Sequence, residues 1–120
     1  MSEIKNKKRY DLEDRTLRFA KRINKYVNNL PRTISNIENG KQLVRAGGSV
    51  GANYREANEA ISKKDFALRI KICRKEAKES IFWLELNEPS EEYKIEKEEL
   101  LDEATQLMKI FGSILEKTKN

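Results

Sequence analysis

Residues 42–61 read QLVRAGGSVGANYREANEAI, and the spacing of their side chains decides the fold. Apolar and small residues recur at steps of four and three, which is the pattern of one buried helical stripe. This stripe consists of Leu43, Gly47, Val50, Tyr54, Ala57 and Ile61. Polar residues follow similar steps on another side of the helix, at Arg45, Ser49, Asn53 and Glu56. Two such faces predict a helix that packs against neighbours on more than one side.

The same helix, predicted from Thr33 or Ser35 to about Ala60, contains several glycines. They are Gly40, Gly47, Gly48 and Gly51. Each costs about 1 kcal/mol relative to alanine in a helix, so a break is expected at Gly47-Gly48. The glycines either allow another backbone to approach closely or form a loop that cradles phosphate. The first interpretation is favoured, because no strand precedes the glycines and no Gly-Lys-Ser/Thr sequence follows them.

Three further helices are predicted on the two sides of this segment. The first spans about residues 11–30 and ends before Pro31, because the residue before a proline disfavours helical dihedrals. The third spans about residues 62–87 and the fourth about residues 90–117. The expected N-caps are Asp11, Ser62 and Ser90. Short connections make consecutive helices antiparallel neighbours, so the predicted fold is all-α, an antiparallel up-down-up-down four-helix bundle.

The composition fits a single domain over residues 1–120. Charged and hydrophobic residues each make up 38% of the chain, and only two prolines interrupt it. Residues 1–9 are polar and basic and are expected to be disordered. No apolar run approaches the roughly 20 residues of a membrane span, and the N-terminus lacks the apolar segment of a signal peptide. Because Cys73 is the only cysteine, no internal disulfide can form, and a cytoplasmic location is expected.

The third helix carries two apolar faces. Its core stripe consists of Phe66, Ile70, Cys73, Ala77, Ile81 and Leu84. A second set, which lies more than roughly 90° around the helix from this stripe, consists of Leu68, Ile72, Trp83 and Leu86. A bundle needs one apolar stripe per helix, and aromatic residues are enriched at subunit contacts. The second set is therefore predicted to be an oligomer interface; the alternative is a wide core helix with Trp83 at its edge.

The net charge of +5 is unevenly distributed along the chain. Residues 1–30 hold nine Lys/Arg and four Asp/Glu, whereas residues 91–120 hold five and eight. Basic residues repeat at helical spacing in the first and third helices, at Arg15, Arg18, Arg22 and Lys25, and at Lys71, Lys75 and Lys78. A basic surface attracts polyanions, and it is equally suited to an acidic partner helix. These basic residues are the candidates for nucleic-acid binding.

The polar stripe of the second helix has two interpretations. Arg45 and Ser49 can touch because they lie one turn apart, and Asn53 and Glu56 can touch for the same reason. With Glu76, Glu79 or Lys75 of the third helix as partners, the stripe would form a hydrogen-bonded network that fixes helix register. The alternative is a contact surface for a ligand or nucleic acid. The network is favoured.

The chemistry that the chain lacks argues against catalysis. It has no histidine, the commonest general base and nitrogen ligand near neutral pH. Cys73 lies on a core stripe and is expected to be a small buried hydrophobe, and zinc sites with Cys/His spacing are excluded. A carboxylate metal site from Glu56, Glu76 and Glu79 is a weaker alternative. We therefore expect no enzyme activity and no cofactor.

Three sequence motifs resemble those of a known family. The pattern Arg-x-x-x-Ser-x-x-x-Asn-x-x-Glu of the second helix is followed by SKKDF at residues 62–66 and KEAKESIFWLEL at residues 75–86. From about Tyr10 to the C-terminus, the chain resembles the bacterial four-helix-bundle family of 23S rRNA intervening-sequence proteins. The resemblance implies assembly into a ring-shaped homopentamer. The accessory protein of diversity-generating retroelements is similar, and it is a basic pentamer that binds nucleic acid and a reverse transcriptase.

These observations favour a non-enzymatic oligomer that binds RNA or DNA through phosphates, with little sequence readout. The alternative is a protein–protein interaction or scaffold module without nucleic-acid binding. The expected partners are other copies of the chain, RNA or DNA, and a protein such as a reverse transcriptase. No membrane partner is expected.

Overall fold

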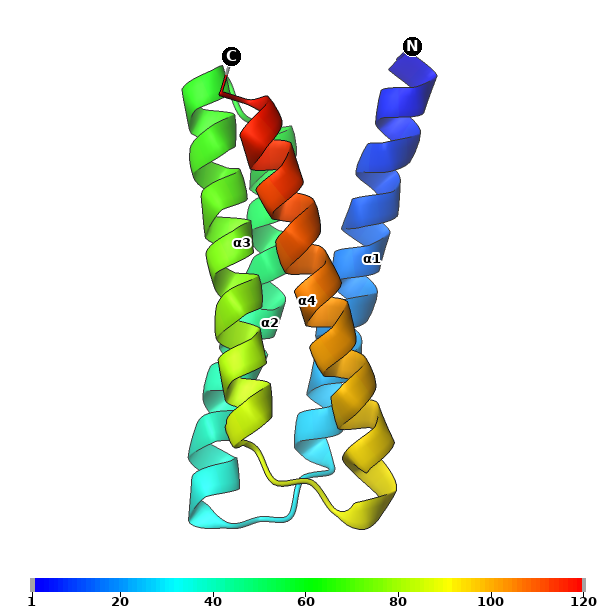
Figure 1. Ribbon diagram of the computed structural model, residues 1–120, viewed down its shortest axis with the longest axis vertical. Helices are drawn as coiled ribbons and strands as arrows, with labels where there is room; N and C mark the ends of the chain where they lie inside the picture. The colour runs from blue at the N-terminus through cyan, green and yellow to red at the C-terminus, as the bar shows by residue number, and fades with distance from the viewer. Residues whose placement is uncertain (1, 120) are drawn as a thin grey trace.

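Four helices run alternately up and down one long axis (Figure 1). The computed structural model describes the backbone of residues 2–119 and the side chains of residues 11–119. The helices are α1 (Ser2–Asn28), α2 (Ile34–Asn58), α3 (Lys63–Leu86) and α4 (Lys94–Lys117), with a short 3-10 turn, η1 (Glu91–Tyr93), before α4. The molecule measures 47 × 23 × 19 Å. The predicted all-α, antiparallel up-down-up-down bundle is confirmed.

The helix ends follow capping chemistry at two of the predicted positions. The Thr33 hydroxyl accepts a hydrogen bond from the amide of Asn36, and the Ser62 hydroxyl accepts one from the amide of Asp65. Ser90 is the N-cap residue of η1 rather than of α4, and its side chain makes no capping hydrogen bond. The backbone amide of Tyr93 donates to the Ser90 carbonyl instead. This hydrogen bond within η1 satisfies the amide that the Ser90 hydroxyl would have capped.

The first helix begins at Ser2 rather than at the predicted cap, Asp11. Residues 2–10 contain neither proline nor glycine, and nothing in their covalent structure stops a helix from extending through them. The segment 1–9 was expected to be disordered; residues 2–9 continue α1, and Met1 lies outside the described residues. Their side chains are also outside the described part.

Three of the four glycines of α2 lie where α1 packs against it, whereas Gly48 is exposed. A Cβ atom added at Gly40 would lie 2.9 Å from Val27, one at Gly47 would lie 3.2 Å from Ile23, and one at Gly51 would lie 2.9 Å from the Thr16 hydroxyl. The interpretation of close helix approach is thus confirmed for these three glycines and is wrong for Gly48. The break predicted at Gly47-Gly48 is wrong, because α2 continues through both residues. Packing against α1 stabilises the helical conformation that glycine alone would disfavour.

The core consists of one apolar stripe from each helix. Its largest fully buried side chains are Phe19, Ile23, Tyr26, Leu43, Val50, Ile70, Leu84, Leu100, Leu107 and Phe111. Tyr54 packs on Phe111 across the bundle, with ring centroids 5.8 Å apart. The prediction that Ile61 belongs to the core is wrong, because its side chain is 97% exposed. Helix α2 ends at Asn58, so Ile61 no longer follows the helical stripe.

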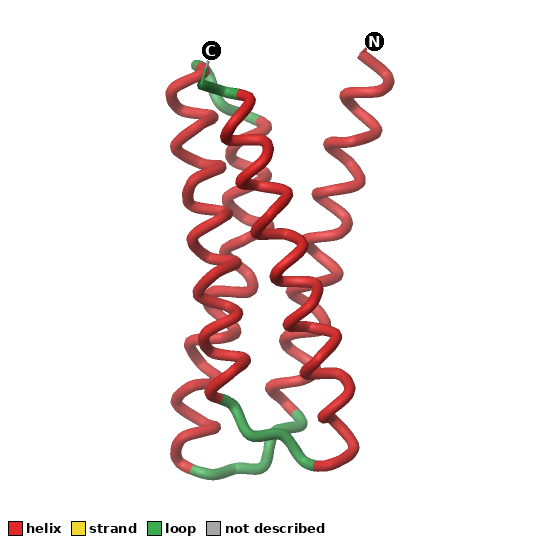
Figure 2. Tube along the Cα trace, in the orientation of Figure 1, coloured by secondary structure: helices red, strands yellow, loops and turns green. Residues whose placement is uncertain are grey.

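A single buried side chain joins the two loops at one end of the bundle. Figure 2 shows that the α1–α2 loop and the α3–α4 loop lie at the same end. The Asn36 amide donates to the carbonyls of Pro31 and Glu88 and accepts a hydrogen bond from the Glu88 backbone amide. These bonds satisfy backbone groups of both loops, and they fix the end of α1 relative to the end of α3.

The close approach of α1 predicts opposite effects for two neighbouring glycines. Gly51→Ala should lower the free energy of unfolding by about 1–2 kcal/mol, because the new methyl group overlaps with Thr16. Gly48→Ala should raise it by about 0.5–1 kcal/mol, because no atom lies within 4 Å of its Cβ position and alanine favours the helix. Urea denaturation followed by circular dichroism measures both. Equal effects of the two substitutions would contradict this packing.

Candidate functional site

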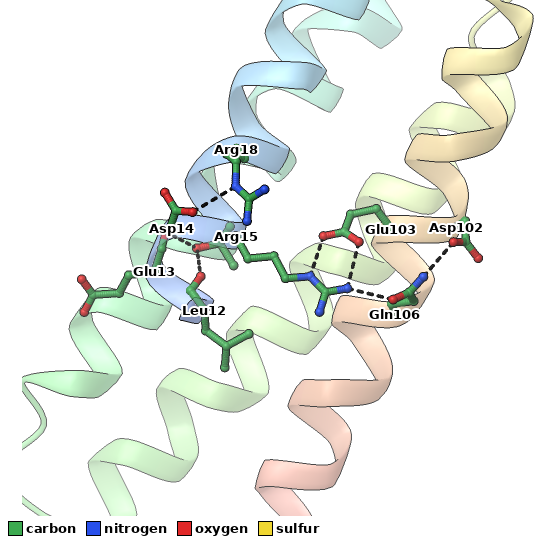
Figure 3. A network of polar contacts seen from close by, with 9 residues as sticks. Leu12, Glu13, Asp14, Arg15, Arg18, Asp102, Glu103 and Gln106 are labelled. Carbon is green, nitrogen blue, oxygen red and sulfur yellow. Dashed lines mark hydrogen bonds and ion pairs between the residues drawn. The ribbon is translucent and has the colours of Figure 1, made fainter. Parts of the chain in front are cut away.

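Arg15 of α1 is bound to an acidic side chain of α4. Its guanidinium donates two hydrogen bonds to the Glu103 carboxylate, at 2.7 and 2.9 Å, and a third to Gln106 at 2.8 Å (Figure 3). Gln106 in turn donates to Asp102. The hydrogen bond with Glu103 raises the pKa of Arg15. This arginine is therefore neutralised within the molecule.

A second α1 arginine is paired in the same way. Arg22 binds both Glu96 and Glu99 of α4, and its hydrogen bond to Glu96 raises its pKa. The basic stripe of α1 thus contacts an acidic helix, as one of the two interpretations proposed. Arg15 and Arg22, two of the candidate nucleic-acid ligands, are thus bound to carboxylates of α4.

The other two candidates on α1 lie on the surface. Arg18 pairs with Asp14 one turn before it, and both side chains are about two-thirds exposed. Lys25 is exposed and has no ion pair among residues 11–119. Of the four predicted α1 cations, only Lys25 is thus unpaired within the described side chains.

The polar stripe of α2 joins it to α3. Arg45 donates to Glu79 at 2.7 Å and to both oxygens of Glu76, whose side chain is 9% exposed. The hydrogen bond to Glu79 is the main cause of the raised pKa of Arg45. Arg69 of α3 donates to the side-chain oxygen of Asn53 at 3.1 Å. These bonds match the predicted network between the two helices.

Within residues 11–119, Asn53 and Glu56, at the C-terminal end of the stripe, make no ion pair with α3. Asn53 donates to the Ser49 backbone carbonyl, while Glu56 is exposed. No hydrogen bond between described residues joins the Arg45 and Ser49 side chains, or those of Asn53 and Glu56. Arg45 additionally donates to the Gln42 side chain of its own helix, at 3.4 Å.

Metal and thiol chemistry have two possible sources in this chain, a cluster of carboxylates and Cys73. Over residues 11–119, no three acidic or cysteine side chains converge to hold a metal ion. Cys73 is fully buried, and burial raises the pKa of its thiol to about 12. A protonated, inaccessible thiol is not a nucleophile.

The outer face of α3 carries exposed apolar side chains opposite the core. Leu68 is 55% exposed and Leu86 44% exposed, and Ile72 is partly exposed between them. Trp83 packs against the edge of the core, as the alternative interpretation of this residue expected. The predicted interface residues therefore share one face, although Trp83 contributes less free surface than the others.

A cationic groove runs along α3 beside this apolar row. Its volume is about 640 Å³, and it is lined by Lys71, Arg74, Lys75, Lys78, Glu79, Phe82, Trp83 and Leu115. The four cations make no ion pair with any side chain of residues 11–119. The one carboxylate in the lining, Glu79, is bound to Arg45. The three lysines predicted on α3 thus lie together, with unneutralised charge.

Sequence reasoning missed two residues of this groove, Arg74 and Phe82. Both follow the same helical spacing as the predicted lysines, since Arg74 is three residues after Lys71 and Phe82 is four after Lys78. Phe82 is 53% exposed, and its ring centroid lies 5.0 Å from that of Trp83. This helical spacing from Lys71 and Lys78 could have identified both residues from the sequence.

The fold and these surfaces define an up-down four-helix bundle with internal ion-pair networks and, in its described part, a cationic face that no carboxylate neutralises. The chain belongs to the family of 23S rRNA-intervening sequence proteins, whose sequence pattern matches residues 8–113. The resemblance seen in the motifs is confirmed. No helix within residues 2–119 is long and apolar enough to cross a bilayer.

A solved structure from the same group supports the fold. A protein of unknown function from the S23 ribosomal protein family of Bacteroides thetaiotaomicron is 31% identical in sequence, with a TM-score of 0.75. The match covers 91% of this chain and 98% of that protein. Comparison with curated proteins gives no match.

The half-buried pair of Arg15 and Glu103 should contribute measurably to stability. A double-mutant cycle with Arg15→Ala and Glu103→Ala should give a coupling energy of about 1 kcal/mol, because the pair is bidentate and partly shielded from water. The exposed pair Arg18 and Asp14 is the matched control and should show no measurable coupling. Urea denaturation supplies all values. A larger coupling in the control pair would contradict the assignment.

Proposed function

We propose that this protein is a non-enzymatic, homo-oligomeric bundle that binds RNA or DNA through the cationic groove of α3. One observation carries the proposal: Lys71, Arg74, Lys75 and Lys78 line one groove without an ion pair to any side chain of residues 11–119. Four neighbouring unpaired cations raise the local positive potential and attract phosphates. Contacts of this kind position a nucleic acid and read little sequence.

The ion pairs between α1 and α4 concentrate this charge on one side. Arg15 and Arg22 are bound to the α4 acids, so they offer little to a polyanion. Arg18 and Lys25 on α1 are exposed, and they make supporting contacts to phosphates. The main part of the proposed interface therefore lies on α3, whereas the sequence suggested two helices equally.

The exposed apolar row of α3 supports self-association. Leu68 and Leu86 lie roughly opposite the core stripe of their own helix, so the bundle itself cannot bury them. A neighbouring copy would remove them from water. A closed ring of five copies, the assembly that the family resemblance implies, would present five cationic grooves. Repetition raises the effective concentration of weak phosphate contacts.

A scaffold role without nucleic acid is the competing function. The aliphatic row of α3 suits a partner protein as well as another copy. Binding of a defined protein partner that survives nuclease treatment, together with no binding of nucleic acid, would favour it.

Neutralising the groove should weaken nucleic-acid binding and its dependence on salt. The double substitution Lys75→Gln and Lys78→Gln should lower the slope of log affinity against log salt by about 2, which is about 1 for each phosphate that the protein no longer neutralises. Lys21→Gln with Lys109→Gln, two exposed lysines outside the groove, is the matched control. Fluorescence anisotropy with labelled RNA and DNA measures the slopes. Absence of any salt-dependent binding by the wild type would refute the proposal.

Charge placed in the apolar row should break the assembly. Leu68→Glu with Leu86→Glu should reduce the mass in solution to that of one chain, because a buried interface does not tolerate unpaired carboxylates. Ile95→Glu on α4, at a residue that is 74% exposed, should leave the mass unchanged. Multi-angle light scattering gives the mass directly. A wild-type monomer would show that the oligomer interface and the ring are both wrong.

A further inference from the structure

Phe82 is an exposed aromatic side chain that lines the cationic groove and packs against Trp83. Its ring meets Trp83 at 75° with centroids 5.0 Å apart, and Trp83 packs against the buried core. Edge-to-face contact of this kind is favourable. Phe82 nevertheless remains 53% exposed. A large apolar ring is thus open to solvent and supported from behind.

The cations stand in line with this ring. Lys78 precedes Phe82 by one turn, about 6 Å along the axis, and Arg74 and Lys71 continue the line at helical spacing. An aromatic surface followed by a row of charges matches a ligand that carries a flat apolar group beside a chain of anions. Nucleobases on a phosphate backbone have this chemistry.

We infer that the α3 groove binds single-stranded nucleic acid, with Phe82 stacking on an unpaired base while the neighbouring cations contact phosphates. This inference rests on the proposed function and makes it more specific. In a duplex, both faces of each internal base are covered by its neighbours, so Phe82 has no base to stack on. A strand without base pairing offers free faces, and stacking tolerates any base.

The exposed ring of Phe82 favours this occupant over an acidic peptide, because the charges alone do not distinguish the two. Four cations line the groove against one carboxylate, which is already bound to Arg45. A peptide would satisfy the charges but has no repeated flat groups to cover Phe82. The two occupants differ in whether the bases themselves contribute to affinity, and this difference can be measured.

The test compares three ligands of equal length, each of about 12 nucleotides, within the site sizes of known single-strand-binding grooves. They are a thymidine oligonucleotide, its duplex with the complementary strand, and an abasic strand that keeps the phosphates and lacks bases. Anisotropy is measured at one low salt concentration with the wild type, Phe82→Leu and Phe82→Tyr. Leucine keeps apolar bulk without the ring, and tyrosine keeps the ring. Both substitutions fall on an exposed side chain, and circular dichroism checks that each variant is folded.

The inference expects Phe82→Leu to weaken single-strand binding roughly tenfold and to leave duplex and abasic binding unchanged, whereas Phe82→Tyr behaves like the wild type. Trp83, the only tryptophan of the chain, should change its fluorescence with the thymidine strand and not with the abasic strand. Equal loss for all three ligands, or no loss for any of them, would overturn the stacking role, while salt-dependent binding would still support the proposed function. No binding of any strand would overturn both.

Discussion

The close contact between α1 and the glycines of α2 is the constraint on which the other surfaces depend. At Gly47 and Gly51 there is room for Ile23 and Thr16 of α1 only because no Cβ atom stands in the way. This contact sets the rotation and depth of α1. It places the other side of α1 within reach of α4, where Arg15 and Arg22 meet acidic partners. With these two arginines paired, the unpaired cations that lie together in one groove are those of α3, within the described part of the chain.

Much of this architecture follows from patterns that a single helix imposes on its sequence. Apolar spacing identified the core stripes, and the hydroxyl groups of Thr33 and Ser62 marked two helix starts, because both effects are local. The start of α1 at Ser2 could not be predicted, because a polar segment such as residues 2–10 has the same composition whether it is helical or disordered. The continuity of α2 through Gly47 was missed because its stabilisation comes from Ile23, which lies far away in sequence.

The candidate site was only partly predictable for a related reason. Lys71, Lys75 and Lys78 were visible as a stripe, whereas the pairing of Arg15 with Glu103 depends on which helices become neighbours. Charge pairing across the bundle is a tertiary property, and sequence gives the charges without their partners. Phe82 was overlooked because it falls outside the apolar sets, although its spacing from Lys78 places it on the cationic side of α3.

The ion pairs between α2 and α3 also affect the cationic groove. Glu79 lines the cationic groove, yet its carboxylate is bound to Arg45 at 2.7 Å, on the side towards α2. Without Arg45, this carboxylate would be the natural partner of Lys75, which lies four residues before it on the same helix. By holding Glu79, Arg45 keeps that lysine unpaired. The positive potential of the α3 groove thus originates partly in an arginine of a different helix, which does not line it.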